Sequence, residues 1–173
     1  MARSGFAVSE GLLNAWKESA EDPGVRALFL SVNTSDSEVD FGRDVRAEGS
    51  LEEDFSILAD FVEENPDTDG VWILHVSENK WVLVTYIPDS LPASRKMVLS
   101  SSTPEILDAL DRSKIHGHFH ASSPDDLTWK EFFEWFSRHK ETAAPEVGSD
   151  EDLRRQIVRA PPVRCNCAAV ASS

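Results

Sequence analysis

The sequence predicts an α/β domain of the α+β type, with a central mixed five-stranded sheet flanked by helices on both faces. The predicted elements follow the order helix, two strands, helix, two strands, long helix, strand and helix. Helices that separate strand pairs in this way can cover both faces of one sheet. In addition, residues 71–76 and 81–86 are apolar on both faces, which is typical of strands at the centre of a covered sheet.

The first half of the chain begins with a predicted helix over residues 9–19, which Ser9 can cap with its hydroxyl. Strands are expected over residues 25–33 and 38–45, which are rich in β-forming residues. Ser50 and Glu53 then form a capping box, the usual start of a helix. The apolar face of that helix consists of Leu51, Phe55, Leu58 and Val62.

The second half begins with a hairpin, whose strands are joined by the short turn Ser77-Glu78-Asn79-Lys80. A long helix is predicted over residues 93–110, interrupted at Thr103-Pro104-Glu105 because proline cannot donate a helical hydrogen bond. A fifth strand is expected over residues 115–121. Pro124, with two aspartates beside it, is expected to open a last helix to about His139. The buried stripe of that helix is expected to contain Trp129, Phe132, Phe133 and Phe136.

The apolar periodicity stops after Lys140, so we expect a domain over residues 1–140 and a flexible tail or linker over residues 141–173. A short helix over residues 150–158 is the one element expected in the tail. Arginines alternate there with apolar residues, which favours either a solvated linker or a segment that binds a partner or lipid. These residues are Leu153, Arg154, Arg155, Ile157, Val158, Arg159 and Arg164.

Composition excludes several classes of protein. The net charge of −14 argues against nucleic-acid binding, and it means that any acidic partner must be met by a local basic patch. No apolar run reaches the roughly 18 residues of a membrane helix, and the first residues lack a secretory signal. The two cysteines, Cys165 and Cys167, both lie in the tail. A disulfide-built domain is therefore excluded, and a cytoplasmic location is expected.

His116, His118 and His120 alternate along the fifth predicted strand, so an unbroken strand would place all three imidazoles on one face. Three histidines can hold a catalytic zinc ion. Neighbouring side chains on a flat strand do not easily converge on one ion, however, and no carboxylate adjacent in the sequence would support them. A polar strand face is therefore favoured, with a metal-dependent enzyme as the alternative.

Three short motifs resemble the actin-depolymerising factor/cofilin homology family, most closely the N-terminal domain of twinfilins. They are the Ser4-Gly5-Phe6 start, the pairs Lys96-Met97 and Ser100-Ser101 of the long helix, and Asp126-Leu127-Thr128 before the last helix. The resemblance covers residues 4–139 and implies the ADF/cofilin-homology (gelsolin-like) fold. It also implies an actin-binding protein of the cytoplasm and cytoskeleton that is not an enzyme and needs no cofactor.

The resemblance further implies which residues contact actin and which partners are expected. The partner is the actin monomer, capping protein could bind through the tail, and phosphoinositide binding stays open. Arg138 and Lys140 are implied as filament contacts. Met97 could instead be a core residue, an alternative that the sequence leaves open. The implied actin contacts are Ser4, Gly5, Phe6, Arg95, Lys96, Met97, Ser100 and Ser101.

Two departures from the family pattern favour monomer binding and sequestration. The hairpin turn at residues 77–80 is short and nearly neutral, whereas cofilins that bind filament sides carry a long basic hairpin. Cofilins also place a lysine where this chain has Ser94. The alternatives are cofilin-like filament-side binding and severing, and glia maturation factor-like binding to the Arp2/3 complex.

Overall fold

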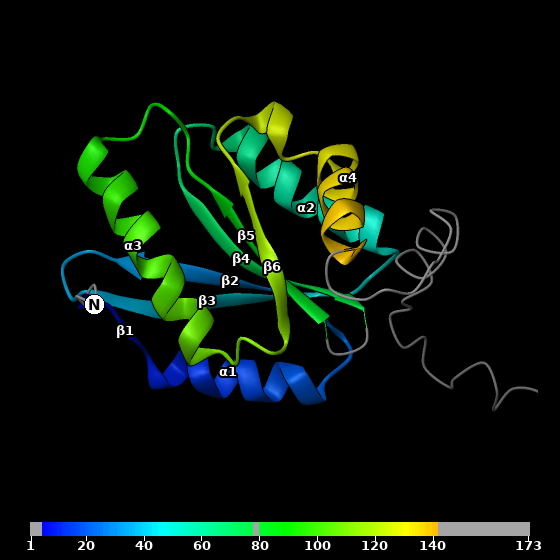
Figure 1. The fold of residues 1–173 in the computed structure, drawn as a ribbon, viewed down its shortest axis with the longest axis horizontal. Coiled ribbons are helices and arrows are strands. Elements are labelled where there is room, and N and C mark those ends of the chain that lie inside the picture. Colours follow the sequence, from blue (N-terminus) through cyan, green and yellow to red (C-terminus); the bar gives the residue numbers. More distant parts are fainter. Residues whose placement is uncertain (1–4, 78–79, 142–173) are drawn as a thin grey trace, which may run out of the picture.

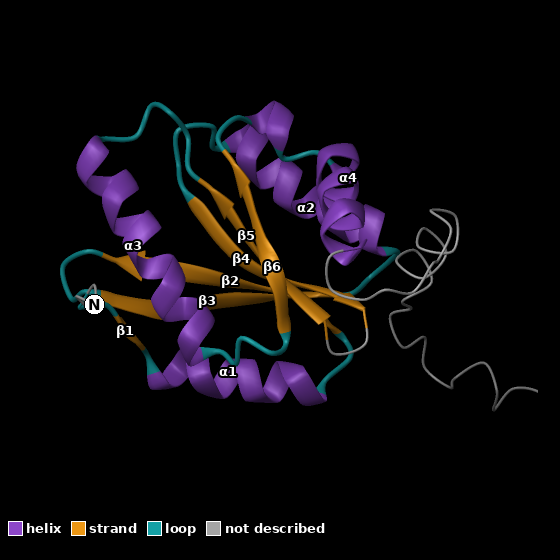
Figure 2. Cartoon of the chain, in the orientation of Figure 1, coloured by secondary structure: helices purple, strands orange, loops and turns teal. Residues whose placement is uncertain are grey.

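The computed structural model describes residues 5–77 and 80–141, although not the side chains at positions 140 and 141. These residues form one mixed sheet of six strands in the order β1-β3-β2-β4-β5-β6 (Figures 1 and 2). The pairs β1–β3 and β5–β6 are parallel, and the other neighbours are antiparallel. The strands are β1 Ala7–Val8, β2 Val25–Asn33, β3 Glu38–Arg46, β4 Gly70–Ser77, β5 Lys80–Tyr86 and β6 Ile115–Ala121.

The expected mixed sheet is confirmed, and the expected number of five strands is wrong by one. The additional strand, β1, has two residues, too few to produce an alternating pattern in the sequence. It is held to β3 by backbone hydrogen bonds of 2.9 Å from the Ala7 amide to the Ser37 carbonyl and from the Ser9 amide to the Val39 carbonyl. The expected tail, residues 141–173, lies almost entirely outside the described residues, as does the expected helix at 150–158.

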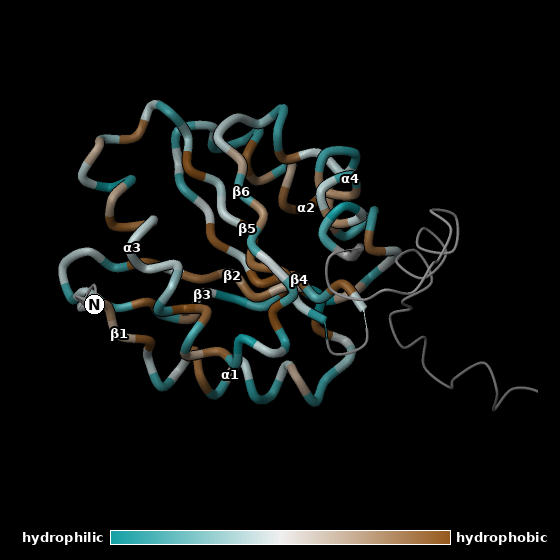
Figure 3. Tube along the Cα trace, viewed as in Figure 1, coloured by the Kyte–Doolittle hydropathy of each residue, from teal (hydrophilic) through white to brown (hydrophobic). Residues whose placement is uncertain are grey.

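In the part of the chain that the structure describes, four α-helices cover the two faces of the sheet (Figure 1). Helices α1 and α3 pack on one face, and α2 and α4 pack on the other, so each face has its own hydrophobic core. Strands β4 and β5 contribute alternate residues to both cores, which confirms their expected central position; Figure 3 shows hydrophobic residues along the centre of the sheet. The helices are α1 Glu10–Glu21, α2 Leu51–Glu64, α3 Ala93–Ala109 and α4 Trp129–Glu141.

The first two helices begin at the predicted caps. The Ser9 hydroxyl accepts a hydrogen bond of 3.1 Å from the Leu12 amide. In the capping box of α2, the Glu53 amide donates to the Ser50 hydroxyl at 3.2 Å and the Ser50 amide donates to the Glu53 carboxylate at 2.7 Å. Each cap satisfies backbone donors that have no partner inside the helix.

Helix α3 is continuous through Pro104, so the predicted interruption at residues 103–105 is wrong. Leu99 and Ile106, on either side of the proline, are each 1% exposed. Burying two such side chains contributes about 1.5–3 kcal/mol each, which offsets the roughly 3 kcal/mol that proline costs inside a helix. Pro104 and Ser100 are both exposed, so water can bind the Ser100 carbonyl that lacks its helical donor.

The segment expected to open the last helix is a separate 3-10 helix, η1 Pro124–Asp126. Leu127 then leaves helical geometry, with φ −92° and ψ 54°, and its fully buried side chain enters the core. Helix α4 therefore begins at Trp129, later than predicted. Its expected apolar stripe is confirmed, with Phe132 and Phe136 buried and two further aromatics, Trp129 and Phe133, partly buried.

A buried ion pair links three of these elements. Arg26 of β2 donates from Nε to the Asp54 carboxylate of α2 at 2.7 Å, and both side chains are 3% exposed. The other Asp54 oxygen accepts the backbone amides of Glu48 and Gly49 at 3.2 and 3.0 Å. Arg26 also donates to the carbonyl of His75 in β4 at 3.3 Å. The pair thus fixes α2 and the loop before it against the sheet.

Among the helices of the described residues, none combines the length and apolar character that crossing a membrane requires.

Candidate functional site

The outer face of α3 is the first part of the candidate site. Met97 is 72% exposed and is the one large hydrophobic side chain that is exposed among the described residues. Its exposure decides against the core alternative. Exposed neighbours at helical spacing form a strip along α3, which we call the α3 strip. The α3 strip consists of Ala93, Met97, Ser100, Pro104 and Asp108.

The opposite side of α3 packs on the sheet, and the α3 strip therefore faces solvent. Leu99, Ser102 and Ile106 are each 1% exposed and face the sheet. The hydroxyls of Ser101 and Ser102 donate to carbonyls of the preceding turn, both at 3.0 Å. Ser101, a predicted contact, is therefore half-buried with its proton engaged, while Ser100 is exposed in the α3 strip.

Arg95 is engaged within the protein. Its Nε and Nη2 donate to the two carboxylate oxygens of Asp69 at 3.0 and 2.9 Å, a bidentate pair in which Arg95 is 25% and Asp69 17% exposed. Its Nη1 donates to the Val32 carbonyl and the Thr34 hydroxyl, both at 2.9 Å. Arg95 thus ties the start of α3 to the end of β2 and the entry to β4. Its role as an actin contact, implied by the resemblance, stays a prediction.

Lys96 is held much more loosely. Its Nζ donates to the Asp89 carbonyl at 2.9 Å and lies 3.5 Å from the Asp89 carboxylate. The Lys96 side chain is 35% exposed and that of Asp89 is 92% exposed. Such an exposed ion pair contributes about 0–1 kcal/mol, so Lys96 can exchange Asp89 for a carboxylate of a partner at little cost.

The N-terminal segment reaches the same side of the molecule. Ser4 lies outside the described residues. Gly5 is exposed and adopts φ +74°, a conformation that glycine takes without strain. Phe6 is half-buried and packs against the core shared by α1 and α3. Strand β1, which follows, contacts α3, so the structure brings Gly5 and Phe6 near the predicted helix contacts.

The two residues predicted as filament contacts lie elsewhere. Arg138 is exposed near the end of α4, where its Nε donates to the Glu134 carbonyl at 3.2 Å. Lys140 belongs to the same helix, and its side chain lies outside the described part of the structure. Because α4 covers the sheet face opposite α3, this basic end does not join the α3 strip. The short hairpin is confirmed, since Ser77 pairs directly with Lys80.

The expected alignment of three histidines on one strand face is wrong. Trp81 of β5 pairs with Ile115 and Val82 with Gly117, so His116 is the extra residue of a β-bulge. A bulge shifts the alternation by one residue. His116 therefore lies toward α4, 5.7 Å from the Phe136 ring, while His118 and His120 lie on the other face. No group of three or more His, Cys, Asp or Glu in the described residues could hold a metal ion.

Thr85 joins the two remaining histidines. Its buried hydroxyl lies 2.7 Å from His118 Nε2 and 3.1 Å from His120 Nδ1. Burial, together with the positive charge that His120 can carry, lowers the pKa of His118 to about 4. His118 is therefore neutral at pH 7. It lies on the sheet face that α3 covers, hydrogen-bonded to Thr85.

Sequence reasoning missed Asp69 and Asp89, the carboxylates that bind Arg95 and Lys96. Asp69 lies in the turn before β4, 26 residues from Arg95. Its local sequence, Thr68-Asp69-Gly70, is typical of an ordinary turn. No signal in the sequence links these residues to α3.

Comparison with known proteins gives a consistent result. Residues 5–137 match the family described as cofilin/tropomyosin-type actin-binding protein. The cofilin of Kluyveromyces lactis is 28% identical over 121 residues, which cover 64% of this chain and 79% of that cofilin. An Eh twinfilin structure is 19% identical with a TM-score of 0.67, covering 78% of this chain and 99% of the twinfilin. A Streptomyces griseoflavus cofilin structure is 14% identical with a TM-score of 0.62, and the match covers 78% of this chain and 98% of that cofilin. The two structures share the fold of this chain.

Proposed function

Because this chain belongs to the family of cofilin/tropomyosin-type actin-binding proteins, we propose that it binds and sequesters actin monomers and thereby regulates filament turnover. The domain itself is an actin-binding domain of the ADF/cofilin type, a family of actin regulators rather than enzymes. Monomer sequestration in the manner of a twinfilin, and a cytoplasmic location at the cytoskeleton, are the finer parts of the proposal.

The observation that carries the proposal is the exposure of Met97 at the centre of the α3 strip. A methionine side chain that is 72% exposed on a helix can serve as an apolar contact for a partner, because methionine adapts to different surfaces. Lys96 lies beside it with a weak, exchangeable partner. This cation supplies local positive charge in a chain of net charge −14, which an acidic partner would otherwise repel.

The preference for monomers rests on the hairpin between β4 and β5. A protein that binds along a filament needs a second contact surface for the neighbouring subunit. Here Ser77 pairs with Lys80, so two residues join the strands and cannot project far at roughly 3.5 Å per residue. The basic end of α4, with Arg138 and Lys140, is the feature that favours filament-side binding as the second candidate.

Two assays separate these candidates. In a pelleting assay at physiological salt, we expect most of the protein to stay in the supernatant while pelletable actin falls in proportion to added protein. Titration of labelled monomeric actin should saturate at one protein per monomer. Stoichiometric co-pelleting with intact filaments would instead establish cofilin-like side binding. Failure to bind actin, combined with capture of the Arp2/3 complex, would establish the glia maturation factor-like alternative.

Capping-protein binding through the tail and phosphoinositide binding stay predictions, because residues 142–173 lie outside the described part of the chain. The same preparations can test them with purified capping protein and with phosphoinositide vesicles.

A further inference from the structure

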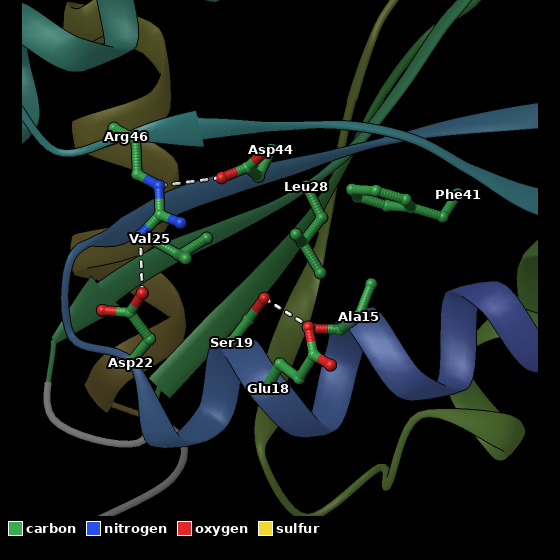
Figure 4. Close-up of a pocket in the computed structure, with 9 residues that line it drawn as sticks. All are labelled: Ala15, Glu18, Ser19, Asp22, Val25, Leu28, Phe41, Asp44 and Arg46. Carbon is green, nitrogen blue, oxygen red and sulfur yellow. Dashed lines mark hydrogen bonds and ion pairs between the residues drawn. The ribbon is translucent and has the colours of Figure 1, made fainter.

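A groove lies between α1 and the strands β2 and β3 (Figure 4). Its volume of about 210 Å³ is below the roughly 300–1,000 Å³ of pockets that hold small molecules. The groove therefore suits one or two side chains of a peptide better than a cofactor. We call it the α1–β3 groove; it is lined by Ala15, Glu18, Ser19, Asp22, Val25, Leu28, Phe41, Asp44 and Arg46.

The two ends of the α1–β3 groove differ in chemistry. Leu28 and Phe41 lie together at one end, and at the other Arg46 lies between Asp22 and Asp44 (Figure 4). The Arg46 guanidinium binds Asp22 at 2.5 Å and Asp44 at 2.9 Å. Glu18 adds a third, exposed carboxylate. The lining therefore holds three carboxylates and one guanidinium, so the groove is negative, and Glu18 is a lining carboxylate outside the two ion pairs of Arg46.

The neighbouring edge of β3 can accept an extended chain. Strand β1 pairs with β3 at Glu38 and Val39 only. Beyond Val39, no strand of the described residues pairs with this edge of β3 as far as Arg46. An open edge of this kind offers backbone donors and acceptors to an extended peptide, whose alternate side chains then point into an adjacent groove.

The charge pattern of the whole sequence points to an occupant. All 31 acidic side chains of the chain precede residue 153. The segment from Leu153 onward carries four arginines and no acid, so the chain is divided into a strongly acidic part and a basic end. We propose that residues 153–159 of this same chain bind in the α1–β3 groove.

The spacing within that segment fits the groove. On binding, residues 153–159 would be extended instead of helical as the sequence alone predicts, and Leu153, Arg155, Ile157 and Arg159 would then share one side, an alternation of apolar and basic residues. Their counterparts in the groove are the half-buried Phe41 at the apolar end and the exposed carboxylate of Glu18. Such tethered binding needs only weak contacts, because attachment to the domain gives the segment an effective concentration of about a millimolar.

The stretch of chain between α4 and the proposed segment allows a long reach. Figure 1 shows α1 and α4 ending toward the same side of the view. Twelve residues from Glu141 to Leu153 can span up to about 40 Å. The α1–β3 groove shares no residue with the α3 strip, so binding of the tail leaves Met97 accessible. The inference is thus independent of the proposed function.

The two cysteines of the chain allow a label to be attached near the proposed segment, because Cys165 and Cys167 lie six and eight residues after Arg159. A nitroxide attached to them should broaden the NMR signals of backbone amides in residues 15–22 and 41–46. The broadening should weaken as salt is raised, because the contact depends on exposed charges. It should also disappear in the tail variant Arg154→Ala/Arg155→Ala/Arg159→Ala and in the groove variant Glu18→Gln/Asp44→Asn.

The matched control is Asp60→Asn/Glu63→Gln, which removes two exposed carboxylates from α2 and should retain the broadening. Circular dichroism should be unchanged in all variants, since every altered groove residue is exposed. Uniform broadening, or broadening centred on α3 or α4, would overturn the inference. Broadening that persists in both the tail variant and the groove variant would also overturn the inference. Loss of the effect on dilution would show that the segment of a second copy occupies the groove instead.

Discussion

At the scale of single residues, the two adjacent cations of α3 have different roles. Arg95 uses its guanidinium on Asp69, Val32 and Thr34, whereas Lys96 holds only an exposed contact with Asp89. Lys96 could bind a carboxylate of a partner while the fold stays intact. If Arg95 did the same, the contacts that hold the start of α3 to Asp69, Val32 and Thr34 would be lost. In the sequence the two residues resemble one basic patch. In the structure, Arg95 holds α3 in place and Lys96 is available to bind a partner.

We expect Arg95→Ala to lower the free energy of unfolding by about 1–3 kcal/mol, because it leaves the largely buried Asp69 carboxylate without its partner. Lys96→Ala should change it by no more than about 0.5 kcal/mol, as for other exposed positions. Chemical denaturation of both variants measures the difference. An Arg95→Ala protein as stable as the unaltered chain would show that this ion pair does not hold α3.

Met97→Ala should weaken monomeric actin binding by about 5- to 30-fold, equivalent to about 1–2 kcal/mol, as for a central interface contact. Its effect on stability should stay within about 0.5 kcal/mol, since the side chain is 72% exposed. Titration of labelled actin measures the affinity, with Lys130→Ala on α4 as the control at an exposed position off the α3 strip. Equal affinities for the two variants would remove Met97 from the interface.

At the scale of elements, the long-range contacts decide how helices and strands are aligned. The bulge at His116 moves one histidine to the α4 side of β6 and leaves two on the α3 side. Helix α3 passes through Pro104 because its flanking apolar residues are buried on the sheet. Helix α2 is fixed by the buried pair of Arg26 and Asp54.

We expect Asp54→Ala to destabilise the protein by about 3–5 kcal/mol, because Arg26 would keep a buried charge without a carboxylate partner. The double variant Arg26→Met/Asp54→Leu should recover most of that loss, since no buried charge remains. Urea denaturation of the two proteins tests this comparison. A double variant that is no more stable than Asp54→Ala would mean that the packing of α2, rather than charge, limits stability.

At the scale of the whole molecule, the folded state should lose stability as the pH falls. The pKa of His118 is lowered from 6.5 to about 4 by burial and by His120. Burial and the Arg26 charge also lower the pKa of His75. Between about pH 6.5 and 4 the unfolded chain therefore binds protons that the folded protein does not, so stability is full above pH 6.5 and declines toward pH 4.

Thermal melts between pH 7.5 and 4.5 should show this decline. The contribution of His118 is at most roughly 3 kcal/mol, because a tenfold difference in proton affinity between the folded and unfolded chains corresponds to about 1.4 kcal/mol. His118→Gln, which can still hydrogen-bond to Thr85, should flatten the pH dependence, and His120→Gln, which removes only the smaller cause of the lowered His118 pKa, should flatten it less. A pH dependence that His118→Gln leaves unchanged would assign the decline to other groups.

The sequence by itself determined the order of the elements, the two central strands and most helix starts. Ser9 and the Ser50–Glu53 box are local, because each cap forms between residues no more than three positions apart. The apolar runs of β4 and β5 likewise predict a position between two layers of helices. The family motifs also lie within short segments, so they could be recognised without the fold.

Only the tertiary structure decided which predicted site residues are available. Arg95 meets Asp69 and Val32 across 26 and 63 positions of sequence, and no local pattern encodes such a pairing. The exposure of Met97, the bulge that turns His116 away and the α1–β3 groove depend in the same way on how separate elements pack. Local hydrogen bonding and periodicity fix each element, but the register and contacts between elements arise only when the whole sheet is assembled.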